Sequence, residues 1–239
     1  DDDFRVNLKA LKKAVGRNTI LIAASAPQYA HGVVDPIEAI GEIAQKKKIP
    51  FHVDGCFGGF ILPWIEQLGR PLPVFDFRVP GVTSMSADVH KYGYAPKGSS
   101  VVLYRDMTYL KHQFFVSTDW PGGIYASPTM QGTRPGSAIA TAWASLMGMG
   151  QTGFMELADG AMKAADRLRA GIRDIDGLRL LDDGEATIVT YASDAEDVDV
   201  YAVADWLQER GWSVDRQQYP PSIHCSVNAH NGPVIDTYL

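Results

Sequence analysis

Two short segments in the first half of the sequence place a chemically useful side chain at the end of a strand. Residues 49–54 form an apolar run that ends at Asp54, and a second strand-like run, residues 82–87, is followed by His90 and Lys91. A strand-end carboxylate can bind a metal, a ribose or a protonated pyridine nitrogen, or simply cap a nearby backbone. A lysine at a buried strand end is uncommon unless it is paired or used chemically, because a desolvated ammonium is costly. The alternative is a lysine that extends to solvent.

These residue types together favour one cofactor chemistry. Desolvation should lower the pKa of Lys91, and the neutral amine is the form that adds to a carbonyl. Pyridoxal 5′-phosphate (PLP) needs an amine for its aldehyde, an acid that keeps its pyridine nitrogen protonated, and donors for its phosphate. Lys91, Asp54, Lys97 and several Gly, Ser and Thr segments supply these roles. We therefore predict a PLP site around Asp54 and Lys91.

The segments that flank these residues predict an α/β fold. Residues 19–24 read as a strand, and a helix is expected from Asp35, as its cap, with Pro36 in the first turn. A strand, a helix and a second strand at 49–54 form a βαβ unit, which implies a mostly parallel sheet. A turn around Lys97 then leads to another strand at 100–104.

The second half of the sequence predicts a different pattern of secondary structure. Residues 118–136 are rich in Gly, Pro and Thr and predict a long ordered loop. Helical patterns cover 137–149 and 154–175, and the remainder predicts a small α+β unit with strands at 187–191, 212–216 and 222–228 and a helix at 200–210. We accordingly expect residues 1–150 to belong to a large domain, 151–180 to a connecting helix and 181–239 to a small C-terminal domain.

Composition excludes several classes of protein. The net charge of −6 disfavours a nucleic-acid partner, and no apolar run reaches the roughly 20 residues that cross a bilayer. Cys56 and Cys225 lie far apart and match no metal-ligand spacing, so no metal is expected and a reducing compartment fits. The opening Asp1-Asp2-Asp3 is not a signal peptide. A cytoplasmic protein is the expectation.

Several motifs resemble a known family. Residues 52–60 (HVDGCFGGF) are similar to the H-V-D-A stretch of group II PLP-dependent decarboxylases. Residues 84–100 are closer still to the sphingosine-1-phosphate lyase family, one branch of that superfamily. The resemblance runs from about Pro27 to His224 and includes segments 75–79, 118–128 and 220–224. General decarboxylases share the Asp and the His-Lys but lack the WPGGIY run.

The resemblance implies a fold and an activity. The fold would be the PLP-dependent transferase-like fold (fold type I), a large domain with a mostly parallel sheet plus a small C-terminal α+β domain. The activity would be retro-aldol cleavage of a sphingoid base 1-phosphate into a long-chain fatty aldehyde and phosphoethanolamine, in a homodimer with shared active sites. The rival interpretations are an amino-acid decarboxylase, which breaks a different bond, and a non-catalytic fragment or partner subunit.

The resemblance also assigns roles to single residues. Asp54 would pair with the pyridine nitrogen and Lys91 would form the Schiff base. Lys97 resembles the family's phosphate-binding lysine, although a solvated turn lysine is the plain alternative. His90 would contact phosphate or substrate, unless it is an ordinary core histidine. His31 is expected on the cofactor side of the sheet.

The predicted long loop carries the remaining site residues. Gly122 and Gly123 would reach the cofactor phosphate of a neighbouring subunit, because glycines let backbone N–H groups approach an anion closely, unless they form an ordinary tight turn. Tyr125 and Tyr92 would border the substrate, although large aromatic side chains more often simply pack. Gly55 stands where many relatives have Ala, which should leave more room beside the cofactor.

Family members carry further elements before the region that this sequence matches. These are an N-terminal arm and a Gly/Thr/Ser-rich segment that holds the cofactor phosphate, with a histidine that stacks on the ring. None of them is found in this sequence, so we expect that it covers only part of the protein or that this part has been lost, and that the chain alone does not complete the site. Eukaryotic relatives also have an N-terminal membrane helix, which would lie in that same upstream part, and a bacterial-type enzyme without one is the expectation here.

Overall fold

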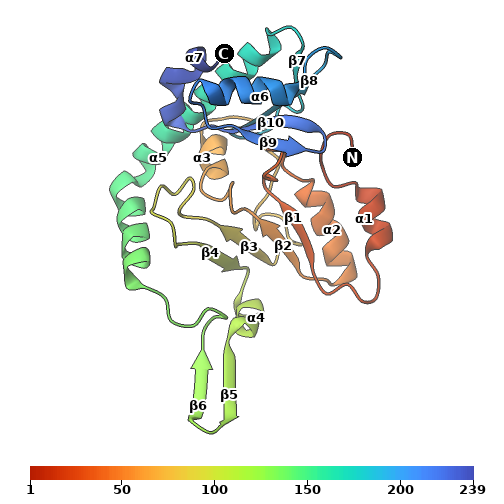
Figure 1. The fold of residues 1–239 in the computed structure, drawn as a ribbon. Helices are drawn as coiled ribbons and strands as arrows, with labels where there is room; N and C mark the ends of the chain where they lie inside the picture. Colours follow the sequence, from red (N-terminus) through yellow and green to blue (C-terminus); the bar gives the residue numbers. More distant parts are fainter.

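The computed structural model describes residues 1–239, and Figure 1 shows two four-stranded sheets joined by one long helix. The first sheet has the order β1-β2-β3-β4, in which β1, β2 and β3 are parallel and β4 is antiparallel. This confirms the predicted mostly parallel sheet. Its strands are Ile22–Ser25 (β1), Phe51–Asp54 (β2), Ser84–Ala87 (β3) and Val101–Tyr104 (β4).

Three helices accompany the first sheet, and α2 shows how its core is built. Apolar side chains of α2 join those of the strands in a cluster of 24 buried residues. Asp35 does not cap α2 as predicted, because its carboxylate accepts hydrogen bonds from the backbone N–H groups of Val6 and Ser25, both at 2.9 Å. Asp35 therefore joins the N-terminal segment to β1. The helices are Leu8–Ala14 (α1), Ile37–Lys47 (α2) and Leu62–Gln67 (α3).

The two faces of the first sheet differ in polarity. Along β2, Phe51 and Val53 are buried in the core, so His52 and Asp54 point to the opposite face. His52 lies opposite Ser84 and Asp54 lies opposite Ser86 in the parallel register with β3. We call these four side chains the polar row. The register thus places Asp54 among hydroxyl and imidazole groups.

A hairpin replaces the first part of the predicted loop. Strands β5 and β6 pair antiparallel, and Figure 1 shows them projecting away from both sheets. The prediction of a loop from residue 118 was wrong because aromatic and β-branched residues flank the Pro-Gly turn, a composition that favours strands. The segment contains Met107–Leu110 (α4), a 3₁₀ helix at Lys111–Gln113 (η1), Phe115–Trp120 (β5) and Gly123–Ser127 (β6).

The two helices predicted next are confirmed as the two halves of α5, Gly136–Arg173. Gly150 interrupts it with a φ of 57° and a ψ of −170°, a conformation that suits glycine. This glycine lies in a G-x-G-x-x-G run, residues 148–153, within the helix, whereas dinucleotide-binding turns connect a strand to a helix. None of the helices, α5 included, has the length and apolarity needed to cross a membrane.

The second sheet is antiparallel and has the order β7-β8-β10-β9. Its core is a cluster of 13 buried residues to which the C-terminal half of α5 contributes Leu168 and Ile172. The strands and the helix expected in this region are confirmed, although β9 begins three residues after the predicted start at residue 212. The elements are Leu178–Leu180 (β7), Ile188–Ser193 (β8), Val200–Glu209 (α6), Asp215–Gln218 (β9), Pro221–Ser226 (β10), Ala229–Val234 (η2, a 3₁₀ helix) and Ile235–Tyr238 (α7). The domain boundaries at 150 and 180 stay a prediction, because α5 enters both cores.

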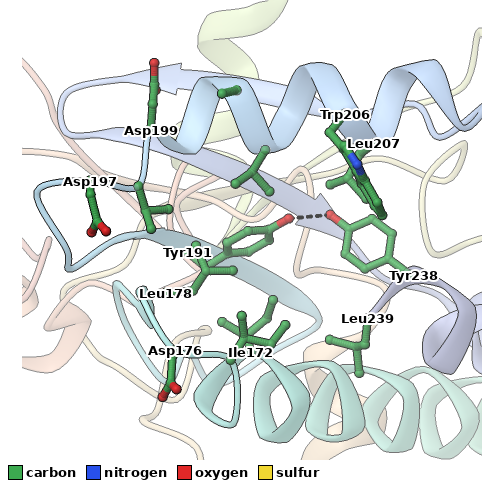
Figure 2. A pocket seen from close by; sticks show the side chains of 14 residues that line it. Ile172, Asp176, Leu178, Tyr191, Asp197, Asp199, Trp206, Leu207, Tyr238 and Leu239 are labelled. Atoms are coloured by element: carbon green, nitrogen blue, oxygen red, sulfur yellow. Dashed lines mark hydrogen bonds between the residues drawn. The ribbon is translucent and has the colours of Figure 1, made fainter.

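A cavity of about 490 Å³ lies beside the second sheet, between α6 and the end of α5 (Figure 2). Its walls are mostly apolar, and the hydroxyl oxygens of Tyr191 and Tyr238 lie 2.6 Å apart in it. No lysine, arginine or histidine lines it, and none of the predicted site residues does. This cavity is therefore not the predicted cofactor site.

Candidate active site

Asp54 ends β2 and holds a directed carboxylate. Its Oδ1 accepts hydrogen bonds from the backbone N–H of Cys56 at 3.0 Å and from the hydroxyl of Ser86 at 3.1 Å. Burial alone raises the pKa of this carboxyl, but the hydrogen bonds from Cys56 and Ser86 outweigh burial and lower the pKa. The plain interpretation, an Asp that caps a nearby backbone, is thus correct for one of these contacts. The carboxylate is half-buried, and because it is ionised it can pair with a cation.

Cys56, which donates to Asp54, also contacts Lys91. The Lys91 Nζ is 3.2 Å from the Sγ of Cys56 and 3.2 Å from the Oδ2 of Asp88. Burial lowers the pKa of Lys91, but the contacts with Cys56 and Asp88 outweigh burial and raise it. The predicted lowered pKa was therefore wrong, since sequence reasoning counted desolvation and not the acid one turn earlier in the chain.

Cys56 and Asp88 are the site residues that the sequence reasoning missed. Burial raises the pKa of the Cys56 thiol, and the neighbouring Asp54 raises it further, so the group is a neutral hydrogen-bonding thiol at neutral pH. A signal existed for both residues. An aspartate commonly accepts a hydrogen bond from the backbone two residues on, which pointed to Cys56, and Asp88 precedes Lys91 by three positions.

His90 and Lys97 lie on either side of the following turn. The His90 Nδ1 is 2.8 Å from the carbonyl oxygen of Ser99, so it carries the proton and donates, and Nε2 is 3.6 Å from Asp88. Lys97 is exposed and forms no ion pair. A polar cavity of about 300 Å³ adjoins this turn, lined by His90 and also by Arg134. The Arg134 guanidinium at this cavity suits an anionic ligand.

The hydrogen bonds and the ring stacking of His31 involve neither Asp54 nor Lys91. The His31 ring stacks on Phe4 with centroids 3.9 Å apart, and its Nδ1 is 2.9 Å from the amide nitrogen of Gln28. Burial, together with the nearby His224, lowers the pKa of His31. The buried Nε2 has no hydrogen-bond partner in the chain. The cofactor-side role predicted for His31 stays a prediction.

Tyr92 is placed in the core rather than at an open site. Its hydroxyl is 2.5 Å from the Oγ1 of Thr187 and donates to the carbonyl of Val227 at 2.6 Å. Both partners belong to the C-terminal part of the chain, so Tyr92 ties the two sheets together. These contacts give the hydroxyl a structural role, and the substrate contact predicted for Tyr92 stays a prediction.

Gly122, Gly123 and Tyr125 lie in the hairpin of β5 and β6, which projects away from both four-stranded sheets (Figure 1). Gly123 adopts a φ of +102°, which the turn requires. Their predicted action on a neighbouring subunit stays a prediction.

Gly55 does not leave the additional room that was expected. A Cβ built there would lie 2.7 Å from the Cε of Met85 and 2.8 Å from the carbonyl oxygen of Ser86. The space is therefore filled by β3 itself.

Comparison with known proteins identifies the family. Residues 1–193 match the pyridoxal-dependent decarboxylase conserved domain. The chain belongs to the pyridoxal-dependent decarboxylase family. Within this family it is 46% identical to the sphingosine-1-phosphate lyase of Arabidopsis thaliana over 239 residues, which cover 100% of the chain and 44% of that relative. It is 47% identical to sphingosine-1-phosphate lyase 1 of Rattus norvegicus over 223 residues, which cover 93% of the chain and 39% of that relative. The decarboxylase-family chain thus spans less than half the length of these relatives.

Solved structures agree with the fold. The chain superposes on the sphingosine-1-phosphate lyase of Burkholderia pseudomallei K96243 with a TM-score of 0.94 and 41% identity, over 99% of this chain and 54% of that one. The glutamate decarboxylase of Lactobacillus brevis gives a TM-score of 0.85 at 24% identity, over 100% of this chain and 57% of that one, which shows the shared fold alone. The predicted α/β fold and the family resemblance are confirmed.

The cofactor of this family is pyridoxal phosphate, and the residues present fit it. An ionised carboxylate at Asp54 suits a protonated pyridine nitrogen. The Lys91 side chain is 32% exposed, so an aldehyde can reach its amine. Asp54 and Lys91 would hold the ring and the aldehyde end of the cofactor, with Lys97 available to an anionic group.

Proposed function

We propose that the protein that contains this chain cleaves phosphorylated long-chain bases by PLP-dependent retro-aldol cleavage, releasing a long-chain aldehyde and phosphoethanolamine. The observation that carries the proposal is the contact series Asp54–Cys56–Lys91, which brings the acid and the amine of a PLP site together. The similarity of the whole chain to sphingosine-1-phosphate lyases supports this substrate class. When bound, the cofactor supplies an electron sink for the bond that breaks.

The side chains of this chain would then have distinct tasks. Asp54 keeps its charge beside the pyridine nitrogen, because its hydrogen bonds outweigh the cost of burial. Lys91 would hold the aldehyde carbon of the cofactor, and Asp88, whose Oδ2 lies 3.2 Å from the Lys91 Nζ, would bind the free amine. Lys97, predicted from the sequence to bind the cofactor phosphate, is exposed and forms no ion pair, and we propose that it binds the phosphate of the substrate instead.

The proposal includes a homodimer with shared active sites. The hairpin exposes large apolar side chains, with Ile124 79% and Val116 61% exposed, and a second copy of the chain is the partner that would cover them. Tyr125 and the turn glycines would then reach the site of that copy. Mixing inactive Lys91→Ala protein with inactive Tyr125→Phe protein should restore activity if sites are shared. A mixture that stays inactive although mixed dimers form would refute sharing.

A cytoplasmic location completes the proposal. The two cysteines, Cys56 and Cys225, are both free thiols, which supports a reducing compartment.

The activity is tested by the products. The PLP-loaded protein is incubated with dihydrosphingosine 1-phosphate, and aldehyde and phosphoethanolamine are measured by mass spectrometry. Equal amounts of the two products are expected from the wild type and from the control Lys111→Ala, which changes another exposed lysine, and none from Lys91→Ala. Release of carbon dioxide from an amino acid without any aldehyde would support a decarboxylase instead. No turnover of either substrate by PLP-loaded protein would support the non-catalytic interpretation.

A further inference from the structure

The polar row forms a continuous series of hydrogen bonds that ends at Asp54. The Oγ of Ser84 lies 2.8 Å from the Nδ1 of His52, and the Nε2 of His52 lies 3.3 Å from the Oγ of Ser86. The hydroxyl of Ser86 donates to the Oδ1 of Asp54 at 3.1 Å. All four side chains come from β2 and β3 and share one face of the sheet through the parallel register.

The ionised end of the series determines where each proton lies. An ionised Asp54 can only accept, so Ser86 uses its one proton toward Asp54 and its oxygen must accept from His52. The Nε2 of His52 therefore carries a proton. The Nδ1 of a neutral His52 then accepts the hydroxyl proton of Ser84. A single neutral tautomer satisfies every contact, with each donor directed toward Asp54.

The surroundings keep His52 neutral. Burial lowers the pKa of His52, and the charge of Asp54 opposes this effect only in part. A neutral imidazole can donate through Nε2 and accept through Nδ1 at once, which a doubly protonated ring cannot do. The half-buried imidazole thus acts as a hydrogen-bond donor to Ser86, and its protonation would leave the Ser84 proton without an acceptor.

We propose that His52 and Ser86 are positioning residues that keep the Asp54 carboxylate ionised and directed at the cofactor's pyridine nitrogen. This inference rests on the proposed function, in which Asp54 pairs with that nitrogen. Removing the Ser86 hydroxyl deletes one of the hydrogen bonds that oppose the desolvation of Asp54. The pyridine nitrogen would then be unprotonated in a fraction of the molecules, and in these the cofactor would be a weaker electron sink.

The strand on the other side of Asp54 offers a matched control. Ser25 on β1 lies opposite Asp54 in the register, as Ser86 does on β3, but its hydroxyl forms no hydrogen bond with the carboxylate. Ser25→Ala therefore removes a hydroxyl from a neighbouring strand without touching the series. Ser86→Thr keeps a hydroxyl at the decisive position and serves as the conservative rescue.

The test reads the pyridine nitrogen directly. Protein loaded with ¹⁵N-labelled PLP is examined by NMR at pH 7.5, where a protonated ring nitrogen is expected in the wild type, Ser25→Ala and Ser86→Thr. Ser86→Ala and His52→Phe should shift the signal toward the unprotonated form and lower kcat about tenfold with little change in KM, as when a supporting partner of a cofactor-binding side chain is lost. In protein without PLP, the imidazole ¹⁵N shifts should show the Nε2–H tautomer of His52 and its loss in Ser86→Ala.

The outcomes separate this inference from the proposed function. If Asp54→Asn leaves the pyridine signal unchanged, the assignment of Asp54 fails, and the proposed function fails at that point. If Asp54→Asn shifts the signal while Ser86→Ala shifts neither the pyridine signal nor the His52 tautomer, the positioning role is refuted and the assignment of Asp54 stands. Should His52→Phe fail to fold, Ser86→Ala and Ser86→Thr decide the matter alone.

Discussion

The Nζ of Lys91 lies 3.2 Å from the Sγ of Cys56. The backbone N–H of the same cysteine donates to Asp54 at 3.0 Å, so one residue touches both the acid and the amine of the site. Lys91 comes from the turn after β3 and Cys56 from the turn after β2. The adjacent parallel pairing of these strands is what brings the two turns together.

The thiol chemistry of the site follows from its burial. Burial raises the pKa of Cys56 and raises that of Cys225 to about 11. The thiolate is the reactive form, so alkylation of the folded protein by iodoacetamide should be slow at pH 7.5 and should accelerate as the pH rises, for Cys225 last. Mass spectrometry of the two cysteine peptides measures this, with urea-unfolded protein as the control. Rapid labelling of Cys56 at pH 7.5 would be inconsistent with a neutral thiol.

Tyr92 and Tyr125 should respond oppositely to loss of their hydroxyl groups. Tyr92→Phe leaves the buried carbonyl of Val227 without its donor, which should cost about 1–3 kcal/mol of the free energy of unfolding. Tyr125, which is 46% exposed, should lose activity on change to Phe with unchanged stability. Urea unfolding and steady-state kinetics separate the two effects. A stable Tyr92→Phe protein with a raised KM would instead support the substrate role that the sequence predicted for Tyr92.

Lys97 should contribute to substrate binding and little to folding. The side chain is exposed and forms no ion pair, so Lys97→Ala should leave the melting temperature unchanged. Loss of its charge should raise the KM for a phosphorylated substrate about tenfold, equivalent to about 1.4 kcal/mol. Lys97→Arg should retain part of the affinity, and Lys111→Ala should behave as the wild type. An unchanged KM in Lys97→Ala would identify an ordinary solvated turn lysine.

Stability should fall as the solution becomes acidic. Burial lowers the pKa values of His31 and His224 below the value of about 6.5 that an unfolded chain has. Below that pH the unfolded chain binds more protons than the folded one, so the free energy of unfolding decreases as the pH falls from 7 toward 5. Urea unfolding at several pH values measures the slope. His224→Asn should flatten it, the exposed His112→Gln should not, and a slope unaffected by His224→Asn would contradict this explanation.

The sequence predicted those features that depend on neighbours along the chain. The apolar runs before Asp54 and Lys91 identified both strand ends, and the structure places them at adjacent turns. The pairing of Asp54 with Ser86 could not be predicted, because it depends on which strands pair and in what register. The partners of Tyr92 come from strands near residues 187 and 227, contacts that no local pattern encodes. The space at Gly55 was misjudged for the same reason, since Met85 of the neighbouring strand fills it.

The most direct test of the central claim is reductive trapping of the cofactor. The protein is incubated with PLP, treated with borohydride, digested and analysed by mass spectrometry. We predict a visible absorbance band before reduction and a single phosphopyridoxyl group on Lys91 afterwards, both unaffected in Lys111→Ala and both lost in Lys91→Ala. Absence of the modification in the wild type, or its persistence in Lys91→Ala, would contradict the account.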